Sequence, residues 1–388
     1  MKNIIKQASV IGSLLALLIT SGEAMEQHRE KEDRAPYYRN QTEKKEPKVI
    51  TPPASPKLND EWDYFVTADF IYYKAAQEGT EFAYDGVLRN LATYTSASAP
   101  FASVPQGEIA SVGQDWAPGF KVGAGLNTGH DTWSVYAEYT FLRFSNEKTL
   151  TQVGTEVSNF LGLVNSSLTN YYGSQGATAI DSYSITTMNA DWKLNHNKIN
   201  LDLARNFYVS EYLAIKPSAG LTAVWQKQTL ATSAHQNNFT IGATSVIDPV
   251  FSDRQEMEAW GLGLRAGTNL GWYFNKSFSL ASNVFVNTVW TDYNTLSLTS
   301  SMLDPATEGV TTFVNQNNPN YYCINYIVEM GLALRYEIYF NDNKNFFACQ
   351  LGWDAQTWVN WGRFLQVSAT NKADLSLHGL DVKFRLDF

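Results

Sequence analysis

Long stretches of the chain alternate between apolar and polar residues, and this alternation restricts the possible folds more than any other feature. Between residues 324 and 340 every even-numbered residue is apolar or aromatic, whereas the odd-numbered ones include Glu329 and Arg335. Residues 380–388 repeat the pattern. A period of two places successive side chains on opposite faces of a β-strand. We therefore expect strands with one apolar face and one polar, often charged, face.

The expected strands are too long for an ordinary soluble sheet. Strands in soluble proteins average about 5 to 6 residues, whereas a tilted strand that crosses a bilayer needs about 9 to 11. Trp116, Trp133, Trp272 and Trp290 stand near predicted strand ends, where aromatic rings would lie at the two membrane interfaces. An open sheet edge in lipid leaves backbone groups without hydrogen bonds. The sequence therefore predicts an all-β fold, a transmembrane, antiparallel up-and-down β-barrel.

We expect about ten strands, with both chain ends in the periplasm. Their ranges are 62–74, 113–126, 132–144, 184–206, 213–227, 257–274, 278–291, 323–340, 346–358 and 374–388. The connections between them alternate between short and long. The short ones are 127–131, 207–212, 275–277 and 341–345, and the long, polar ones are 75–112, 145–183, 228–256, 292–322 and 359–373. Long extracellular loops and short periplasmic turns are typical of outer-membrane barrels.

The segment 184–206 leaves the strand count open. Its apolar residues occupy even positions through Trp192 and Leu194 and odd positions from Ile199 onward. A β-bulge near His196 explains the change within one strand, whereas a hairpin there would give eleven strands. An even number of strands favours the bulge. Further short strands inside the long loops would raise the count to twelve or more.

The N-terminal residues predict export from the cytoplasm. Lys2 and Lys6 precede an apolar run over residues 8–19, and Gly22 and Ala24 occupy the small-residue positions before a cleavage site. Residues 1–24 are therefore a predicted signal peptide, since the apolar run is too short for a membrane anchor. Residues 25–60 mix charges with prolines and predict a flexible periplasmic leader. Residues 61–388 remain for the barrel, which we expect in the bacterial outer membrane.

Composition excludes several classes of function. A net charge of -9 argues against nucleic acid as a partner. The two cysteines, Cys323 and Cys349, are too few for a disulfide scaffold or a structural zinc site. None of the five histidines has a partner in a catalytic motif. We therefore expect no enzyme activity, no metal and no cofactor.

Charged residues of the polar strand faces are the candidate lining of the barrel. A charge on the lipid face costs about 2 to 4 kcal/mol at the membrane centre, so the face that carries the charges is the inner one. The candidates are Lys121, Glu138, Asp191, Lys193, Lys216, Arg265, Glu329, Arg335, Glu337, Asp354, Lys383 and Arg385. They predict either a hydrated path that sorts solutes by size and charge or a salt-bridge network that fills a narrow barrel.

The last strand carries a candidate recognition element. Phe384, Leu386 and Phe388 occupy alternate positions at the chain end. Such an aromatic-ended strand is a predicted signal for the barrel-assembly machinery, which would bind it by β-augmentation. The same residues also give this strand its lipid-facing side.

Several segments resemble the major outer membrane protein family of Legionella and of chlamydia-related bacteria, a family of porin-like proteins. One is Trp-Gly-Leu-Gly-Leu-Arg-Ala-Gly at 260–267, and the others lie at 116–123, 135–140, 201–210, 217–221, 331–337 and 378–388. Their order and spacing fit over roughly residues 62–388. The resemblance implies an abundant, surface-exposed protein of the outer membrane.

The sequence therefore predicts a porin that lets small hydrophilic solutes diffuse passively along a charged lumen. The alternative is a plugged structural barrel or adhesin that contacts host or envelope partners through loops 145–183, 228–256 and 292–322. Expected partners are outer-membrane lipid, the barrel-assembly machinery and the diffusing solutes. A homo-oligomer is left open.

Overall fold

The computed structural model describes residues 62–90, 103–128, 133–152, 159–163, 185–210, 212–236, 238–241, 244–318, 320–366 and 369–388. All of them belong to one unit, Val49–Phe388. The predicted signal peptide and leader, residues 1–60, lie outside the described residues. In the described part of the chain, no helix is long and apolar enough to span a membrane.

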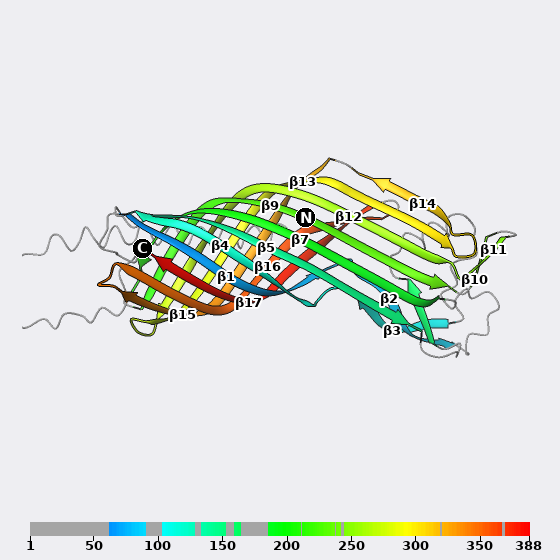
Figure 1. Cartoon of the computed structure of the whole chain (residues 1–388), viewed down its shortest axis with the longest axis horizontal. Coiled ribbons are helices and arrows are strands. Elements are labelled where there is room, and N and C mark those ends of the chain that lie inside the picture. The colour runs from blue at the N-terminus through cyan, green and yellow to red at the C-terminus, as the bar shows by residue number, and fades with distance from the viewer. Residues whose placement is uncertain are drawn as a thin grey trace, which may run out of the picture. The chain divides into compact units, whose positions relative to one another are not determined.

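Ten antiparallel strands form a closed ring. In ring order they are β12 (Val250–Tyr273), β13 (Phe278–Asp304), β15 (Tyr321–Phe340), β16 (Asn345–Gln366), β17 (Ala369–Asp387), β1 (Trp62–Gln77), β4 (Trp116–Thr128), β5 (Trp133–Thr151), β7 (Ile185–Arg205) and β9 (Leu213–Gln236). Pairing of β9 with β12 closes the ring, and β17 pairs with β1. Figure 1 shows these strands running obliquely side by side. The predicted ten-stranded barrel is confirmed.

Shorter strands occupy parts of the predicted loops. β14 (Gly309–Asn317) pairs with β13, and the short β8 (Phe207–Tyr208) pairs with β9, both outside the ring. The remaining described strands form a hairpin, β10 (Asn238–Ile241) with β11 (Thr244–Ile247), and a small sheet of β2 (Glu81–Asn90), β3 (Ser103–Ser111) and β6 (Asn159–Leu163). We call the barrel end near β10, β11 and β14 the hairpin end (Figure 1). The opposite end, where Phe274–Phe278 and Phe340–Asn345 connect strands, is the turn end.

Strand β7 contains neither the predicted bulge nor the alternative hairpin. Its pairing with β5 and β9 runs without a shift through His196, which faces Leu142 on one side and Gln226 on the other. Even-numbered residues point inward from Met188 to Ala204, and both Trp192 and Lys198 are buried. The apparent change of parity has another cause. Inward residues are apolar up to Leu194 and polar or charged from His196 to Asp202, so the apolar residues change face while the strand register stays constant.

An apolar belt surrounds the turn-end half of the barrel. Outward side chains remain exposed although they are large and apolar, for example Leu264 at 70%, Ile324 at 59% and Leu351 at 55%. A continuous exposed apolar surface of this kind is stable against lipid and not against water. Aromatic pairs mark its borders, such as Trp260 with Trp290 at a ring-centroid distance of 5.4 Å. The barrel therefore spans a membrane with this belt.

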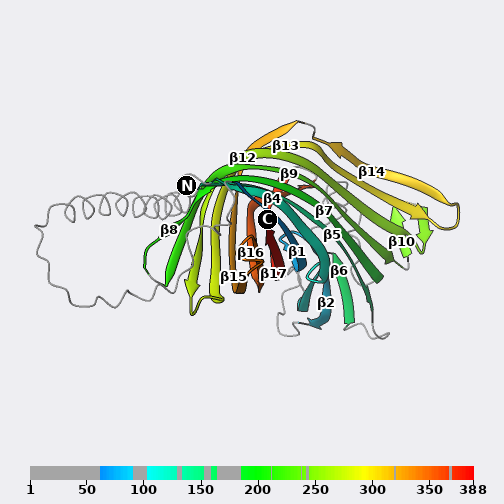
Figure 2. The ribbon, with the colours of Figure 1, turned by 60° about the vertical axis from the view of Figure 1, so that its left-hand side comes forward.

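The strands continue beyond the belt toward the hairpin end, where the pattern inverts. β13 has 27 residues and β9 and β12 have 24 each, far more than the 9 to 11 or so that a membrane requires. Outward residues there form exposed ion pairs, such as Lys227 with Glu258. Inward residues form a buried apolar cluster to which all ten ring strands contribute. Figure 2 shows β7, β9, β12 and β13 extending toward β10 and β14.

Candidate functional site

The inner face of the barrel gathers most of the predicted lining residues. All except Asp191 and Lys193 lie on the inward parity of their strands, and they surround two cavities at the level of the apolar belt and below it. Asp191 and Lys193 pair with each other at 2.6 Å on the outer surface, and the Lys193 side chain is 56% exposed. Their predicted inward orientation is wrong, because Trp192 between them points into the apolar cluster.

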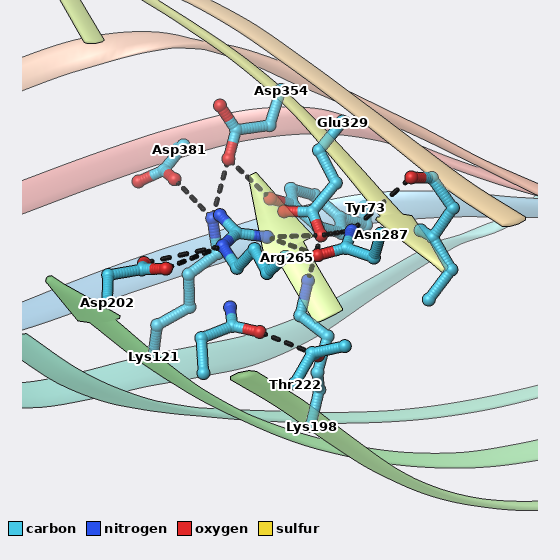
Figure 3. Close-up of polar contacts among 12 residues, drawn as sticks. Tyr73, Lys121, Lys198, Asp202, Thr222, Arg265, Asn287, Glu329, Asp354 and Asp381 are labelled. Atoms are coloured by element: carbon cyan, nitrogen blue, oxygen red, sulfur yellow. Dashed lines mark hydrogen bonds and ion pairs between the residues drawn. The ribbon is translucent and has the colours of Figure 1, made fainter. Parts of the chain in front are cut away.

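Lys121 of β4 holds the first group of charges together. Its ammonium forms ion pairs with Asp354 of β16 at 2.5 Å and with Asp381 of β17 at 2.8 Å. The Tyr73 hydroxyl of β1 donates to the same Asp354 carboxylate at 2.9 Å. Figure 3 shows these side chains converging from four strands. One buried ammonium thus bridges two carboxylates that come from adjacent strands.

Glu329 of β15 is the centre of a second group. Its Oε1 accepts from Lys198 at 2.7 Å, from Arg265 at 2.7 Å and from the Asn287 amide at 2.8 Å. Arg265 also forms an ion pair with Asp202 of β7 at 3.2 Å (Figure 3). Sequence analysis missed Lys198 as a lining residue. The even parity of Trp192 and Leu194, continued without a bulge, would have placed it inside.

A third group lies nearer the turn end. Lys383 forms ion pairs with Asp69 at 3.1 Å and with Glu138 at 3.2 Å. Two other predicted cations of this region have carboxylate partners on their own strands. These pairs are Arg335 with Glu337 at 3.2 Å and Arg385 with Asp387 at 2.6 Å.

Several ion pairs of the three groups bridge strands that are not neighbours in the ring. Lys198 and Glu329 come from β7 and β15, which have three strands between them on the shorter way round. Two cavities of about 200 Å³ and about 160 Å³ remain among the charged groups, and both are lined by Tyr136, Asp202 and Lys383. The bore at membrane level is therefore a filled, polar interior with small spaces of a size that suits water or small ions.

Apolar side chains fill the bore on the hairpin-end side of the charged groups. The rings of His196 on β7 and Trp358 on β16 meet at a centroid distance of 4.9 Å. These strands are five positions apart in a ring of ten, so the contact joins opposite walls. Trp192 donates to Gln228, which donates to Gln226 beside His196, so a hydrogen-bonded chain borders this contact. Buried side chains from opposite walls therefore pack against each other at this level of the bore.

The hairpin-end parts of β16 and β17 add a second closure, which we call the inserted hairpin (residues 358–366 and 369–375). A bulge between Trp358 and Gly362, with Asn360 at a φ of 53°, turns both Trp358 and Trp361 inward. Inward side chains of two other strands reach its backbone: Tyr293 donates to the Trp361 carbonyl at 2.7 Å, and the Arg363 N–H contacts Met257 Sδ at 3.3 Å. The hairpin therefore crosses the mouth of the barrel.

This closure corrects the prediction of a polar extracellular loop at 359–373. Five consecutive residues, Trp361, Gly362, Arg363, Phe364 and Leu365, are all buried. A surface strand buries only alternate residues, so burial of both faces identifies a strand that other parts of the chain cover on both sides.

The remaining candidates have simple positions. Phe384, Leu386 and Phe388 are exposed on the outer surface of the belt, and their recognition by the assembly machinery stays a prediction. Among the described residues no cluster of His, Cys, Asp and Glu could hold a metal ion. Cys323 and Cys349 are free thiols.

Comparisons with known proteins agree with this architecture. A family model described as the Legionella pneumophila major outer membrane protein precursor matches residues 54–388. The search of curated proteins finds no match.

Similar solved structures include a FadL homologue of Pseudomonas aeruginosa, at 10% identity and a TM-score of 0.26 over 85% of this chain and 90% of that one. The outer membrane protease OmpT of Escherichia coli shares 10% identity at a TM-score of 0.27, over 84% of this chain and 96% of its own. Ail of Yersinia pestis, solved with the heparin analogue sucrose octasulfate, shares 7% identity at a TM-score of 0.22, over 84% and 99%. TM-scores this low support no inference about function.

Proposed function

The chain belongs to the family of the Legionella pneumophila major outer membrane protein precursor, and from this premise we propose that it is a closed, surface-displaying barrel of the outer membrane. The belt anchors it in lipid. The strands that continue past the belt carry an apolar core and the smaller strands to the outside, because outer-membrane barrels direct their long connections to the cell surface. Its role in this proposal is structural and adhesive, and it involves no catalysis.

The contact between His196 and Trp358 carries the proposal. It joins opposite walls of the barrel, and the inserted hairpin lies beyond it in the same bore. Trp358, Trp361 and Tyr293 are all fully buried there. A solute would have to displace this apolar packing as well as the ion pairs below it, and each large core side chain contributes a few kcal/mol. A barrel packed in this way supports a scaffold better than an open channel.

Conductance in planar lipid bilayers tests this proposal. We expect the folded wild-type protein to give no discrete current steps. Replacement of residues 360–372 by a short Asn-Gly turn, combined with Trp358→Ala, removes the closure, and we expect steps from that variant. Stable steps from wild-type protein of verified fold would contradict the proposal.

Passive diffusion of small hydrophilic solutes is the second candidate. The charged groups and the two cavities at membrane level favour it, because a purely structural interior does not require so many charges. It requires the inserted hairpin to leave the bore. If wild-type protein conducts, Arg265→Glu combined with Arg335→Glu should shift the reversal potential toward cation selectivity. An unchanged reversal potential would remove these residues from the path.

Export is part of the proposal as well. We propose cleavage after Ala24 and recognition of the last strand by the barrel-assembly machinery, as the N-terminal pattern and the exposed Phe384 and Phe388 suggest. The intact mass of protein isolated from outer membranes tests the first point. Loss of outer-membrane insertion on Phe388→Ser, with refolding in detergent preserved, tests the second.

A further inference from the structure

The larger cavity lies at the turn end of the barrel. It has a volume of about 200 Å³, and Tyr273, Tyr339 and Phe346, each close to a short strand connection, form part of its wall. Lys216 and Ser218 of β9 line the same cavity. Because the short connections of outer-membrane barrels face the periplasm, this cavity is the part of the bore nearest to periplasmic solutes.

Lys216 is the one cation lining this cavity that lacks a carboxylate partner among the described residues. Arg335, Lys383 and Arg385 line it too, and each forms an ion pair. The Lys216 side chain is only partly exposed, and its ammonium forms no hydrogen bond or ion pair with the described part of the chain. Shielding an ammonium from water without a counter-ion is unfavourable. Within the described ranges Lys216 therefore has no directly paired counter-ion in this cavity, and only more distant carboxylates and guanidinium groups act on it.

One hydrogen-bonding group beside Lys216 also lacks a partner in the described structure. Ser218 is the next inward residue on β9, and its buried Oγ has no hydrogen-bond partner. The Tyr208 and Tyr273 side chains line the same space. Hydroxyl donors around an ammonium match a ligand that is negatively charged and rich in acceptor oxygens.

We propose that this cavity binds a small oxyanion from the periplasmic side, with Lys216 as its counter-ion and the Ser218 hydroxyl as a donor. Phosphate and carboxylate groups share the required chemistry. Binding here does not depend on whether the bore is open, since the cavity lies on the turn-end side of the His196–Trp358 contact.

Isothermal titration of the refolded, detergent-solubilised full chain tests the site, with inorganic phosphate in one arm and acetate in the other. We expect one anion per chain. Lys216→Gln should weaken binding by about tenfold or more, because it removes a charge-assisted contact, and Ser218→Ala should weaken it by less. Lys227→Gln is the matched control, because Lys227 lies on the outer surface of the same strand and pairs with Glu258. We expect it to bind like the wild type.

The preferred arm identifies the class of ligand: tighter phosphate binding indicates a phosphoryl group and tighter acetate binding a carboxylate. Circular dichroism and heat-modifiable gel migration establish that each variant is folded. Absence of binding in both arms by folded wild type would overturn the proposal, as would equal affinity of wild type and Lys216→Gln. Neither result would bear on the closed bore, which conductance tests separately.

Discussion

The two halves of the barrel have the same backbone but opposite side-chain chemistry. At the belt, outward residues such as Leu201 are apolar and inward residues such as Lys198 are charged. Toward the hairpin end the same strand β7 presents Lys193 outward and Trp192 inward. The alternation of apolar and polar residues therefore identifies a strand. Whether the apolar residues point outward or inward identifies the surroundings of the strand, lipid in the first case and water in the second. A single strand can thus be a membrane strand at one end and a strand of a water-soluble core at the other.

Removal of a central aromatic ring of the hairpin-end core should have the largest effect. Trp358 is fully buried, whereas Trp353 on the same strand is 47% exposed on the outer surface. Trp358→Ala should lower the free energy of unfolding by about 3 to 5 kcal/mol. Trp353→Ala, which leaves no cavity inside the protein, should cost clearly less. Urea titration in phospholipid vesicles measures both, and equal losses would mean that the hairpin end has no packed core.

Neutralising Glu329, at membrane level, should lower the free energy of unfolding by a similar amount. Glu329→Gln leaves the buried Lys198 and Arg265 short of their shared carboxylate, and we expect a loss of about 3 to 5 kcal/mol. Glu256→Gln breaks the exposed pair with Arg254 near the hairpin end and should cost less than about 1 kcal/mol. The same titration applies. A small loss for Glu329→Gln would show that water, and not the ion pairs, solvates these charges.

A new charge on the outer surface should distinguish the two halves directly. Leu201→Lys places an ammonium in the lipid belt and should cost about 2 to 4 kcal/mol. Asn195→Lys makes a comparable change at an exposed position of the same strand and face, where water surrounds it. We expect less than about 1 kcal/mol there, because solvent screens the repulsion from the cross-strand neighbours Arg143 and Lys227. Equal losses of stability for the two variants would mean that lipid also surrounds position 195, so that the belt extends further toward the hairpin end.

The smallest effect should follow from the loss of the outward pair that sequence analysis placed inside. Lys193→Ala removes an exposed ion pair with Asp191 and should change stability by less than about 1 kcal/mol. Accessibility of a cysteine at position 193 to a charged thiol reagent added to whole cells provides a second measurement. Lack of labelling would contradict its outward, extramembrane position.

The fold was largely predictable because alternation and loop lengths are local properties of the sequence. The ten ring strands, including the undivided β7, follow from them. The orientation of Asp191 and Lys193 was not predictable in this way, because we assumed that polar residues face inward along the whole strand. That assumption holds only within the belt, and the position where the belt ends depends on all the strands together.

The partners of the lining residues could not be predicted from local sequence patterns either. Lys198 meets Glu329, and His196 meets Trp358, only because of the order of strands around the ring. The sequence contains one sign of the inserted hairpin: Trp358 ends the predicted strand 346–358, and Trp361 follows it three residues later inside the predicted polar loop 359–373. Two indoles so close together are out of place on a solvated surface.

The pairing of β1 with β17 has a consequence for how the protein forms. It places Phe65 opposite Asp387, so the seam of the ring joins the two described strands that lie furthest apart along the chain. Such a long loop is slow to close, and every other pairing of the ring can form before it. Until that step the growing sheet has two bare edges, each able to capture a foreign strand. Biogenesis of this barrel therefore requires that both edges stay covered until β1 pairs with β17.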